Sequence, residues 1–396
     1  MDTTREPGRE FACGIRTITL SEAGLDEAMA VLTHDLPQAV PSFLLVFFTA
    51  RYDAAALADA LAKAYPGVPV AGCSTAGELS AEGLTEGGLV VIAFPRRGFD
   101  VVSALIPDVA RLSVERGSEA VARLRAELAR RRPNARPGQT FALSLIDGLC
   151  MREEAVVSSI DWALGEIPLV GGSAGDDLAY RSTTLLHDGK VHSDAAVLIL
   201  VHTELPFRVF KSDNFEPTAN KLVVTHSDPG QRTVYELNAE IAAYEYAMVA
   251  GLDPGRLSPF GFAAHPMVVR VGGEYFCRSP RTTNPDGSLS FFCAIDDGVV
   301  LTVAKPVDLV ESLEVALERV DQDLGGVDWI LGFDCVLRRL DAQNRQVTHK
   351  ISDLYRRHNV FGFNTYGEQY RTMHLNQTFT GIAIGRARAA PATGER

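Results

Sequence analysis

The chain has 396 residues, 46% of them hydrophobic and 22% charged, a composition typical of a globular protein with a large buried core. Its net charge of −12 disfavours a nucleic-acid partner, because phosphate binding needs a basic surface. The sequence starts without the apolar segment of a signal peptide, and its apolar runs are too short for a membrane span. The six cysteines lack metal-like spacing, so we expect a cytoplasmic protein with reduced thiols.

The first half of the sequence predicts alternating helices and strands. Residues 43–50 form a fully apolar run, which is typical of a strand covered on both faces. Residues 54–64 are rich in strong helix formers, and the pair Pro66-Gly67 ends that helix. The predicted elements are, in chain order, helix 25–33, strand 43–50, helix 54–64, strands 89–94 and 99–106, and helix 114–131.

The second half predicts more strands. A helix over residues 234–251 ends at a glycine, and a series of short strands with glycine-containing turns follows it. Residues 308–324 then form an amphipathic helix, with leucine and valine on one face. Strands outnumber helices and the two interleave. The expected fold is therefore mixed α+β, a layered α/β assembly of sheets with flanking helices.

One segment recurs three times in the sequence as strand, helix, turn and strand. The copies begin at FLLVFFTA, FALSLID and WILGFDCV and end at VVIAF, VLILV and GIAIG. Residues that recur in all copies are expected to serve the architecture, whereas residues that differ are better candidates for specific chemistry. The recurring positions of the turn are the first glycine (Gly72, Gly171, Gly362), a polar residue (Ser74, Ser173, Asn364), the second glycine (Gly77, Gly175, Gly367) and an acid (Glu78, Asp176, Glu368).

No low-complexity linker divides the chain. The clearest change of character is near residues 225–233, where a polar stretch precedes a long predicted helix. We therefore predict an N-terminal extension (1–40), a first domain with two copies (41–230), a second domain with the third copy (231–386) and a disordered tail (387–396).

These residues resemble the FIST family, whose members combine a FIST N domain with a FIST C domain. The resemblance covers residues 43–385, and it rests on four motifs in a specific order. They are GCSTAGE at residues 72–78, VGGSAGDD at 170–177, the PDGSL hairpin at 285–289 and the closing NTYGEQ…HLNQTFTGIAI at 364–384.

The resemblance implies a cytoplasmic sensory protein in signal transduction rather than an enzyme. Small ligands such as amino acids have been suggested for the family. The closing motif is similar to that of the NosP branch, for which the resemblance implies haem b, nitric oxide as the ligand and a partner histidine kinase in a two-component system. Since the sequence carries no kinase domain, the partner would be a separate protein, and a homo-oligomer is compatible with this picture.

A serine hydrolase is an alternative, because residues 171–175 match the G-x-S-x-G nucleophile elbow around Ser173. The other two copies disfavour it. The first copy has one more residue between its glycines, and the third has Asn364 at the position of the nucleophile. No histidine partner can be assigned from the sequence. A turn that keeps its glycines while this residue changes is more typical of a backbone requirement.

The recurring turns are also candidates for a ligand site. Successive N–H groups in a glycine turn can bind a carboxylate or a phosphate, and the acids could hold the amino group of a zwitterion. The other alternative is that the turns are buried and tie neighbouring strands together. The candidate ligand-binding residues are Ser74, Glu78, Ser173, Asp176, Asn364 and Glu368.

For haem, the sequence must supply one neutral imidazole in an apolar pocket. His374 is the first candidate, because it interrupts a segment that is unique to the third copy, with Arg371 near enough to meet a propionate. His358 follows the third-copy helix and is a second candidate. We therefore predict His374, Arg371, Tyr366 and His358 as cofactor-binding residues, with His374 as the iron ligand. No cluster of histidine, cysteine and acids predicts another metal.

Overall fold

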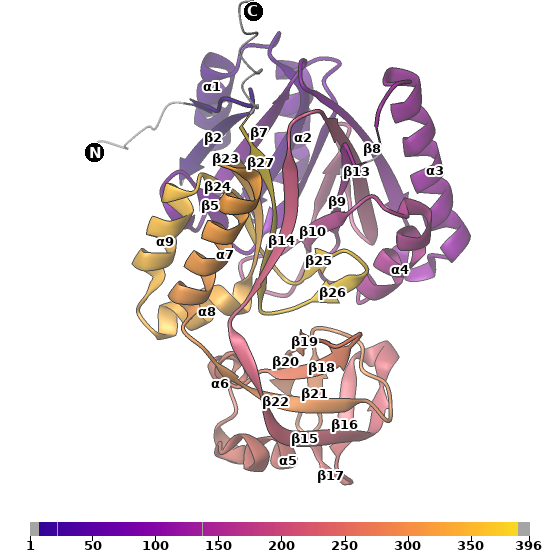
Figure 1. Cartoon of the computed structure of the whole chain (residues 1–396), viewed down its shortest axis with the longest axis vertical. Coiled ribbons are helices and arrows are strands. Elements are labelled where there is room, and N and C mark those ends of the chain that lie inside the picture. Colours follow the sequence, from indigo (N-terminus) through magenta and orange to yellow (C-terminus); the bar gives the residue numbers. More distant parts are fainter. Residues whose placement is uncertain (1–7, 22, 137, 387–396) are drawn as a thin grey trace, which may run out of the picture.

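Three sheets with helices on their outer faces form the body of the protein, and a smaller β-rich domain lies at one end of it (Figure 1). The computed structural model describes residues 8–21, 23–136 and 138–386, so the predicted tail at 387–396 lies outside the described residues. The structure contains 41% strand and 29% helix, which confirms the predicted mixed α+β fold. No helix within the described ranges is long and apolar enough to cross a membrane.

Each copy of the repeat builds one sheet of the body, with the same order of elements. An edge strand is followed by a helix, a central strand, a second helix (two helices in the third copy), a strand parallel to the central one, a hairpin and a return strand. The return strand pairs antiparallel with both the edge strand and the central strand.

The elements of the first copy are β2 (Arg16–Ser21), α1 (Leu25–Asp35), β3 (Pro41–Thr49), α2 (Ala54–Ala64), β4 (Val70–Thr75), β5 (Glu78–Ser80), β6 (Gly83–Thr85) and β7 (Gly88–Pro95), with β1 (Arg9–Glu10) beside β2. Those of the second are β8 (Phe99–Pro107), α3 (Val114–Arg131), β9 (Thr140–Ile146), α4 (Glu153–Leu164), β10 (Leu169–Ser173), β11 (Leu185–His187), β12 (Lys190–His192) and β13 (Ala195–Thr203). Those of the third are β14 (Phe207–Asp213), α7 (Leu309–Leu324), β23 (Val327–Cys335), α8 (Val336–Asn344), α9 (Thr348–Arg357), β24 (Val360–Thr365), β25 (Glu368–Tyr370), β26 (Met373–Leu375) and β27 (Thr378–Gly385).

The central strands are apolar along their whole length because both of their faces are covered. In β3, Leu44, Val46 and Phe48 face a core beneath the helices α1 and α2. The alternate residues, including Phe47, face a second core that all three sheets share. In this shared core the ring of Phe47 lies 4.6 Å from that of Phe363 in the third copy, measured between centroids. The three copies therefore enclose one common interior.

Each sheet is completed by the hairpin of another copy. The hairpin β11–β12 of the second copy pairs with β4 of the first, the hairpin β25–β26 of the third pairs with β10 of the second, and the hairpin β5–β6 of the first pairs with β24 of the third. The resulting sheet orders are β1-β2-β7-β3-β4-β11-β12, β8-β13-β9-β10-β25-β26 and β14-β27-β23-β24-β5-β6. This cyclic exchange gives the body an approximate threefold arrangement.

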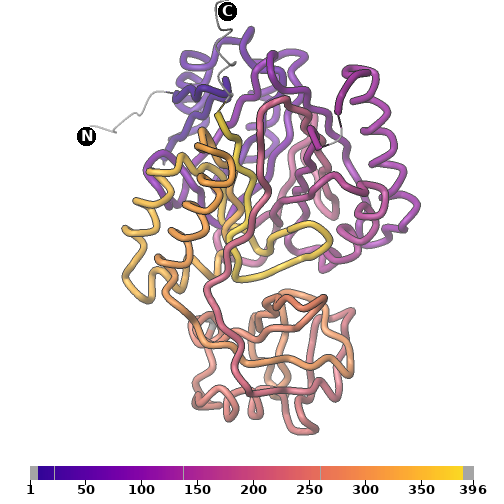
Figure 2. The backbone as a smooth tube through the Cα atoms, viewed as in Figure 1, coloured from indigo at the N-terminus to yellow at the C-terminus, as the bar shows by residue number. Residues whose placement is uncertain are grey.

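The smaller domain is inserted into the third copy between its edge strand β14 and its first helix α7. Figure 2 shows the two chain segments that join it to the body. Its strands follow the order β19-β18-β22-β15-β16-β21-β20 around a separate apolar core. Its elements are β15 (Phe215–Asp228), β16 (Thr233–Leu237), β17 (Glu240–Ile241), α5 (Ala242–Ala250), α6 (Pro259–Ala264), β18 (Met267–Val271), β19 (Glu274–Arg278), β20 (Pro280–Thr283), β21 (Leu289–Phe291) and β22 (Val300–Pro306).

The two predicted divisions of the chain fall inside these units. The predicted boundary at residues 230/231 lies between β15 and β16 of the inserted domain. Much of the predicted N-terminal extension, residues 1–40, consists of β2 and α1, which belong to the first sheet and its covering helices.

Candidate functional site

The three recurring turns meet at the centre of the body, where they form a ring of backbone hydrogen bonds. Each pair of copies contributes two bonds, so every turn is tied to both of the others. Between the first and third turns, Ala76 N donates to Asn364 O (3.0 Å) and Asn364 N donates to Gly77 O (2.7 Å). Between the first and second, Gly175 N donates to Ser74 O (3.0 Å) and Asp177 N donates to Thr75 O (3.2 Å). Between the second and third, Ser173 N donates to Gly367 O (2.8 Å) and Tyr366 N donates to Ser173 O (3.2 Å).

The acids of the first and third turns are fully buried and are bonded inside their own copies. Glu78 accepts hydrogen bonds from Thr75 Oγ1 (2.6 Å) and Gly88 N (3.0 Å). Glu368 makes the equivalent contacts with Thr365 Oγ1 and Thr378 N. Burial raises the pKa of Glu78 to about 7 and that of Glu368 to about 8. Each carboxyl therefore connects its turn by hydrogen bonds to the return strand of the same copy.

The acid of the second turn forms hydrogen bonds with different partners. Asp176 accepts hydrogen bonds from the backbone N–H groups of residues 180, 181 and 182. The hydroxyl of Tyr366 donates to Asp176 Oδ1, and burial raises the pKa of that tyrosine. The ring of Tyr366 stacks on Tyr180 at 4.8 Å between centroids. Tyr366 thus fastens the third turn to the second.

The polar residues of the turns are also enclosed. Ser74 Oγ accepts from Thr184 N at 3.0 Å, and Asn364 Nδ2 donates to Asp334 O at 3.3 Å. Ser173 is fully buried, and its Oγ accepts from Gln369 Nε2 at 3.0 Å. No histidine in the described part of the chain hydrogen-bonds to Ser173, so this geometry does not provide a nucleophile with a general base.

His374 lies directly behind the second glycine of the third turn. A Cβ atom on Gly367 would come within 2.2 Å of His374 Cε1, so the absence of a side chain there makes room for the imidazole. Nδ1 lies 3.4 Å from Gln369 Nε2, whereas Nε2 is buried without a partner among the described residues. Burial lowers the pKa of His374, which favours the neutral ring.

The surroundings of His374 do not fit a haem. It is 2% exposed, and it lies outside five cavities that residues of the described ranges line. Its unpartnered Nε2 is a free donor or acceptor, but the backbone of Gly367 covers the ring. Haem ligation by His374 stays a prediction, and it would require the hairpin β25–β26 to move.

The other two predicted cofactor residues lie elsewhere. His358 follows α9 at the opposite end of β24 from the turns, where burial and the neighbouring Arg357 lower its pKa. Arg371 lies at the tip of the hairpin β25–β26 with a φ of 52°, and its guanidinium covers the ring of Tyr370. The structure therefore does not gather His358, Arg371 and His374 into one pocket.

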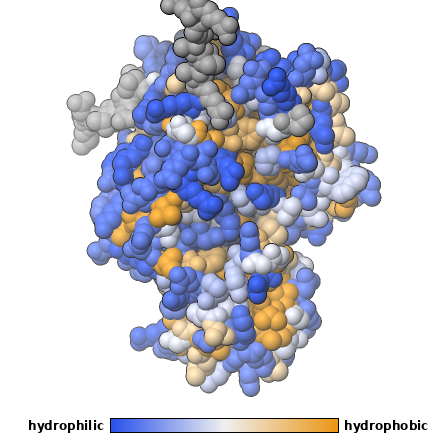
Figure 3. All heavy atoms as spheres, in the orientation of Figure 1, coloured by the Kyte–Doolittle hydropathy of each residue, from blue (hydrophilic) through white to orange (hydrophobic). Residues whose placement is uncertain are grey.

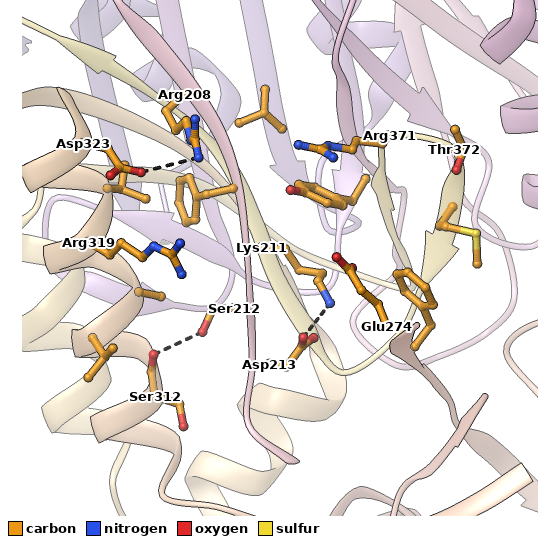
Figure 4. A pocket seen from close by; sticks show the side chains of 18 residues that line it. Arg208, Lys211, Ser212, Asp213, Glu274, Ser312, Arg319, Asp323, Arg371 and Thr372 are labelled. Carbon is orange, nitrogen blue, oxygen red and sulfur yellow. Dashed lines mark hydrogen bonds and ion pairs between the residues drawn. The ribbon is translucent and has the colours of Figure 1, made fainter. Parts of the chain in front are cut away.

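Arg371 instead points into a cavity of about 690 Å³ between the body and the inserted domain (Figure 4). The walls are β14, one side of α7, the start of β19 and the tip of the hairpin β25–β26. Figure 3 shows this face of the molecule as mainly hydrophilic, with apolar patches in the middle of the body and on the inserted domain. The cavity combines polar and apolar walls, and its charged residues are Arg208, Lys211, Asp213, Glu274, Arg319, Asp323 and Arg371.

The charges in this cavity are only partly paired with one another. Lys211 Nζ donates to Asp213 Oδ2 at 2.5 Å and also lies 5.1 Å from the ring centre of Phe276. Arg208 pairs with Asp323 at 3.5 Å. The second oxygen of Asp213, Oδ1, is buried with no partner in the described structure, and burial raises the pKa of that carboxyl against the opposing effect of Lys211. The ion pairs of the described residues leave Arg319, Arg371 and Glu274 unmatched.

Most of these cavity residues were not predicted from the sequence. Arg371 was predicted, but for a haem propionate. Lys211 and Asp213 could have been noticed, because they are charged residues at alternate positions at the end of a strand that also carries Arg208. Nothing in the sequence indicated that Glu274 and Arg319 lie near them, because the inserted domain and α7 bring these residues there.

Comparison with known protein families gives two matches. The FIST N domain matches residues 42–240 and the FIST C domain matches residues 242–371. No curated protein matches the chain. Among solved structures, that of PurLQS from Thermotoga maritima aligns at 11% identity and a TM-score of 0.19, over 97% of this chain and 75% of that one, which is too weak a likeness to carry any argument about fold. The two domain matches together span most of the chain, which therefore belongs to the FIST family.

Proposed function

We propose that this protein is a sensor that binds a free α-amino acid in the cavity between its body and its inserted domain. FIST domains indicate a small-ligand sensor in signalling. The observation that carries the proposal is the set of charges of both signs without an ion-pair partner among the described residues, Arg319, Arg371 and Glu274, which are exposed to solvent and line a cavity of mixed polar and apolar walls. An α-amino acid offers a carboxylate for an arginine and an ammonium group for a glutamate, so it matches this lining.

The origin of the walls explains how binding would be signalled. Glu274 belongs to the inserted domain, whereas Arg319 and Arg371 belong to the body. A ligand that contacts both units favours the arrangement in which they are held together, and it shifts the population toward that arrangement. A partner protein that recognises one arrangement would then respond to the ligand.

A separate signalling protein such as a histidine kinase is the proposed partner. The inserted domain offers an apolar surface for such a contact, because Ile241, Tyr244 and Met248 are each more than half exposed. These residues are spaced three and four apart at the start and along α5, so they lie on one face. Exposed apolar residues grouped in this way are typical of interaction surfaces.

The amino-acid proposal is tested by thermal unfolding with the proteinogenic L-amino acids supplied one at a time. We expect at least one of them to raise the melting temperature by about 2 °C or more at a large excess over its Kd, because a ligand that binds only the folded state stabilises it. Glu274→Gln should abolish this rise, since it removes the group that pairs with the ammonium. Glu318→Gln is the matched control, because Glu318 is exposed on α7 and does not line the cavity. If no amino acid raises the melting temperature, the proposal is rejected.

Haem-based sensing of nitric oxide is the alternative. Because Gly367 and the hairpin enclose His374, we expect protein titrated with hemin to show no Soret band that depends on this histidine. The measurement is an absorption spectrum of the wild type and of His374→Ala at equal hemin concentration. A Soret band that is present in the wild type and lost in the variant would favour haem over an amino acid.

A further inference from the structure

We infer that the ligand of this cavity is an acidic amino acid, with two carboxylates and one ammonium group. The inference rests on the proposed function, and it adds the charge class of the ligand. Its basis is the balance of charges in the cavity and the positions of the side chains that have no ion-pair partner there.

The lining of the cavity carries one net positive charge. Four cations, Arg208, Lys211, Arg319 and Arg371, face three acids, Asp213, Glu274 and Asp323. Two pairs neutralise each other, Lys211 with Asp213 and Arg208 with Asp323. Two arginines and one glutamate remain, and a ligand that matches them has two negative groups and one positive group.

The two unmatched arginines lie on opposite sides of β14 (Figure 4). Arg319 projects from α7 on one side, whereas Arg371 projects from the hairpin β25–β26 on the other. Glu274 lies on the same side of β14 as Arg371. A ligand that reaches all three groups would cross over β14, whose residues 208–213 line the cavity, with one carboxylate and the ammonium group near Arg371 and Glu274 and a second carboxylate near Arg319.

Other small ligands would leave part of this lining without a counter-charge. A neutral amino acid would leave Arg319 unmatched, and a dicarboxylic acid without an amino group would leave Glu274 unmatched. Arg319, Arg371 and Glu274 are exposed to solvent in the unliganded protein. A ligand that covers one of these charges without pairing it removes its hydration, so each mismatch disfavours binding. Selectivity would thus come from unpaired charges as well as from favourable contacts.

The inference is tested by calorimetric titration of the full chain with L-glutamate, L-aspartate, L-glutamine, L-asparagine and glutarate. We expect one acidic amino acid to bind at least about tenfold more tightly than its amide and than glutarate, because a charge-assisted contact is worth that factor or more. Arg319→Gln should remove the preference for the acid over the amide while leaving the affinity for the amide unchanged. Arg371→Gln should lower the affinity for the acid and the affinity for the amide by the same factor.

The control variant is Arg97→Gln, because Arg97 is exposed in the turn between β7 and β8 and does not line the cavity. This variant should bind all five compounds with the same affinity as the wild type. If glutamine or asparagine binds as tightly as the corresponding acid, or if Arg319→Gln keeps the preference, the charge class is wrong while the proposed amino-acid sensor stands. If none of the four amino acids binds and thermal unfolding detects no other, both are rejected. The unliganded melting temperature of each variant shows whether a loss of binding reflects misfolding.

Discussion

Replacing Gly171 by alanine should destabilise the protein by about 3 kcal/mol, because the added methyl group collides with the backbone of the neighbouring strand. A Cβ atom at this position would lie 2.1 Å from Ser144 O in β9. Gly171 and Ser144 are paired in the parallel register of β10 and β9, and β9 is held between two strands. Neither strand can move aside without breaking its backbone hydrogen bonds to the neighbouring strands.

The same collision is expected in the other two copies. The corresponding Cβ positions lie 2.1 Å from Val46 O for Gly72 and 1.8 Å from Gly332 O for Gly362. Gly261→Ala is the matched control, because its Cβ would meet no atom closer than 3.8 Å and alanine favours the helix α6. Urea unfolding measures the free energy of each variant. Equal stability of Gly171→Ala and Gly261→Ala would contradict a role for close strand approach.

The free energy of unfolding should fall by about 3 kcal/mol or more between pH 5 and pH 9 because of Glu78 and Glu368. An unperturbed glutamate has a pKa of 4.5, whereas folding raises the pKa of Glu78 to about 7 and that of Glu368 to about 8. Between the unfolded and folded pKa values the native state therefore holds more protons than the unfolded chain, and stability falls as the pH rises through this window. The stabilisation is complete below pH 4.5 and is lost by about pH 8.

The double variant Glu78→Gln and Glu368→Gln should remove most of this slope. A glutamine stays neutral at every pH, and it can accept from the backbone N–H and donate to the threonine hydroxyl that the carboxyl now contacts. Urea unfolding at several pH values gives the slope, with Glu119→Gln, an exposed residue of α3, as the control. A slope that is unchanged in the double variant would mean that both carboxyls are ionised when buried.

The sequence was sufficient to predict the fold class and the repeat, because both depend on local patterns. Apolar runs such as residues 43–50 identify strands that are covered on both faces, and the recurring glycines mark the turns. The glycines recur for a reason that the sequence does not show. Gly171 is needed for close contact with the neighbouring strand, and Gly367 is needed to accommodate His374.

The arrangement of the site could not be predicted, because it depends on long-range contacts. The inserted domain interrupts the third copy between β14 and α7, so residues 214–308 separate two elements that lie side by side around the cavity. His358 and His374 are close in the sequence, yet they lie at opposite ends of β24 and its hairpin. The exchange of hairpins moves Gln369 next to Ser144 and Ser173 of another copy, which no local pattern indicates.

The exchange of hairpins also sets an order in which the protein can be completed during synthesis. In the first sheet, β4 has no partner on its outer side until β11 and β12 have left the ribosome. In the second sheet, β10 has no partner on its outer side until β25 and β26 have been synthesised. The hairpin β5–β6 is made early, but its partner β24 is one of the last strands to appear. Contacts between such distant segments form slowly. We therefore expect the nascent chain to keep unpaired strand edges until the third copy emerges, which makes the C-terminal residues the closing element of the second and third sheets.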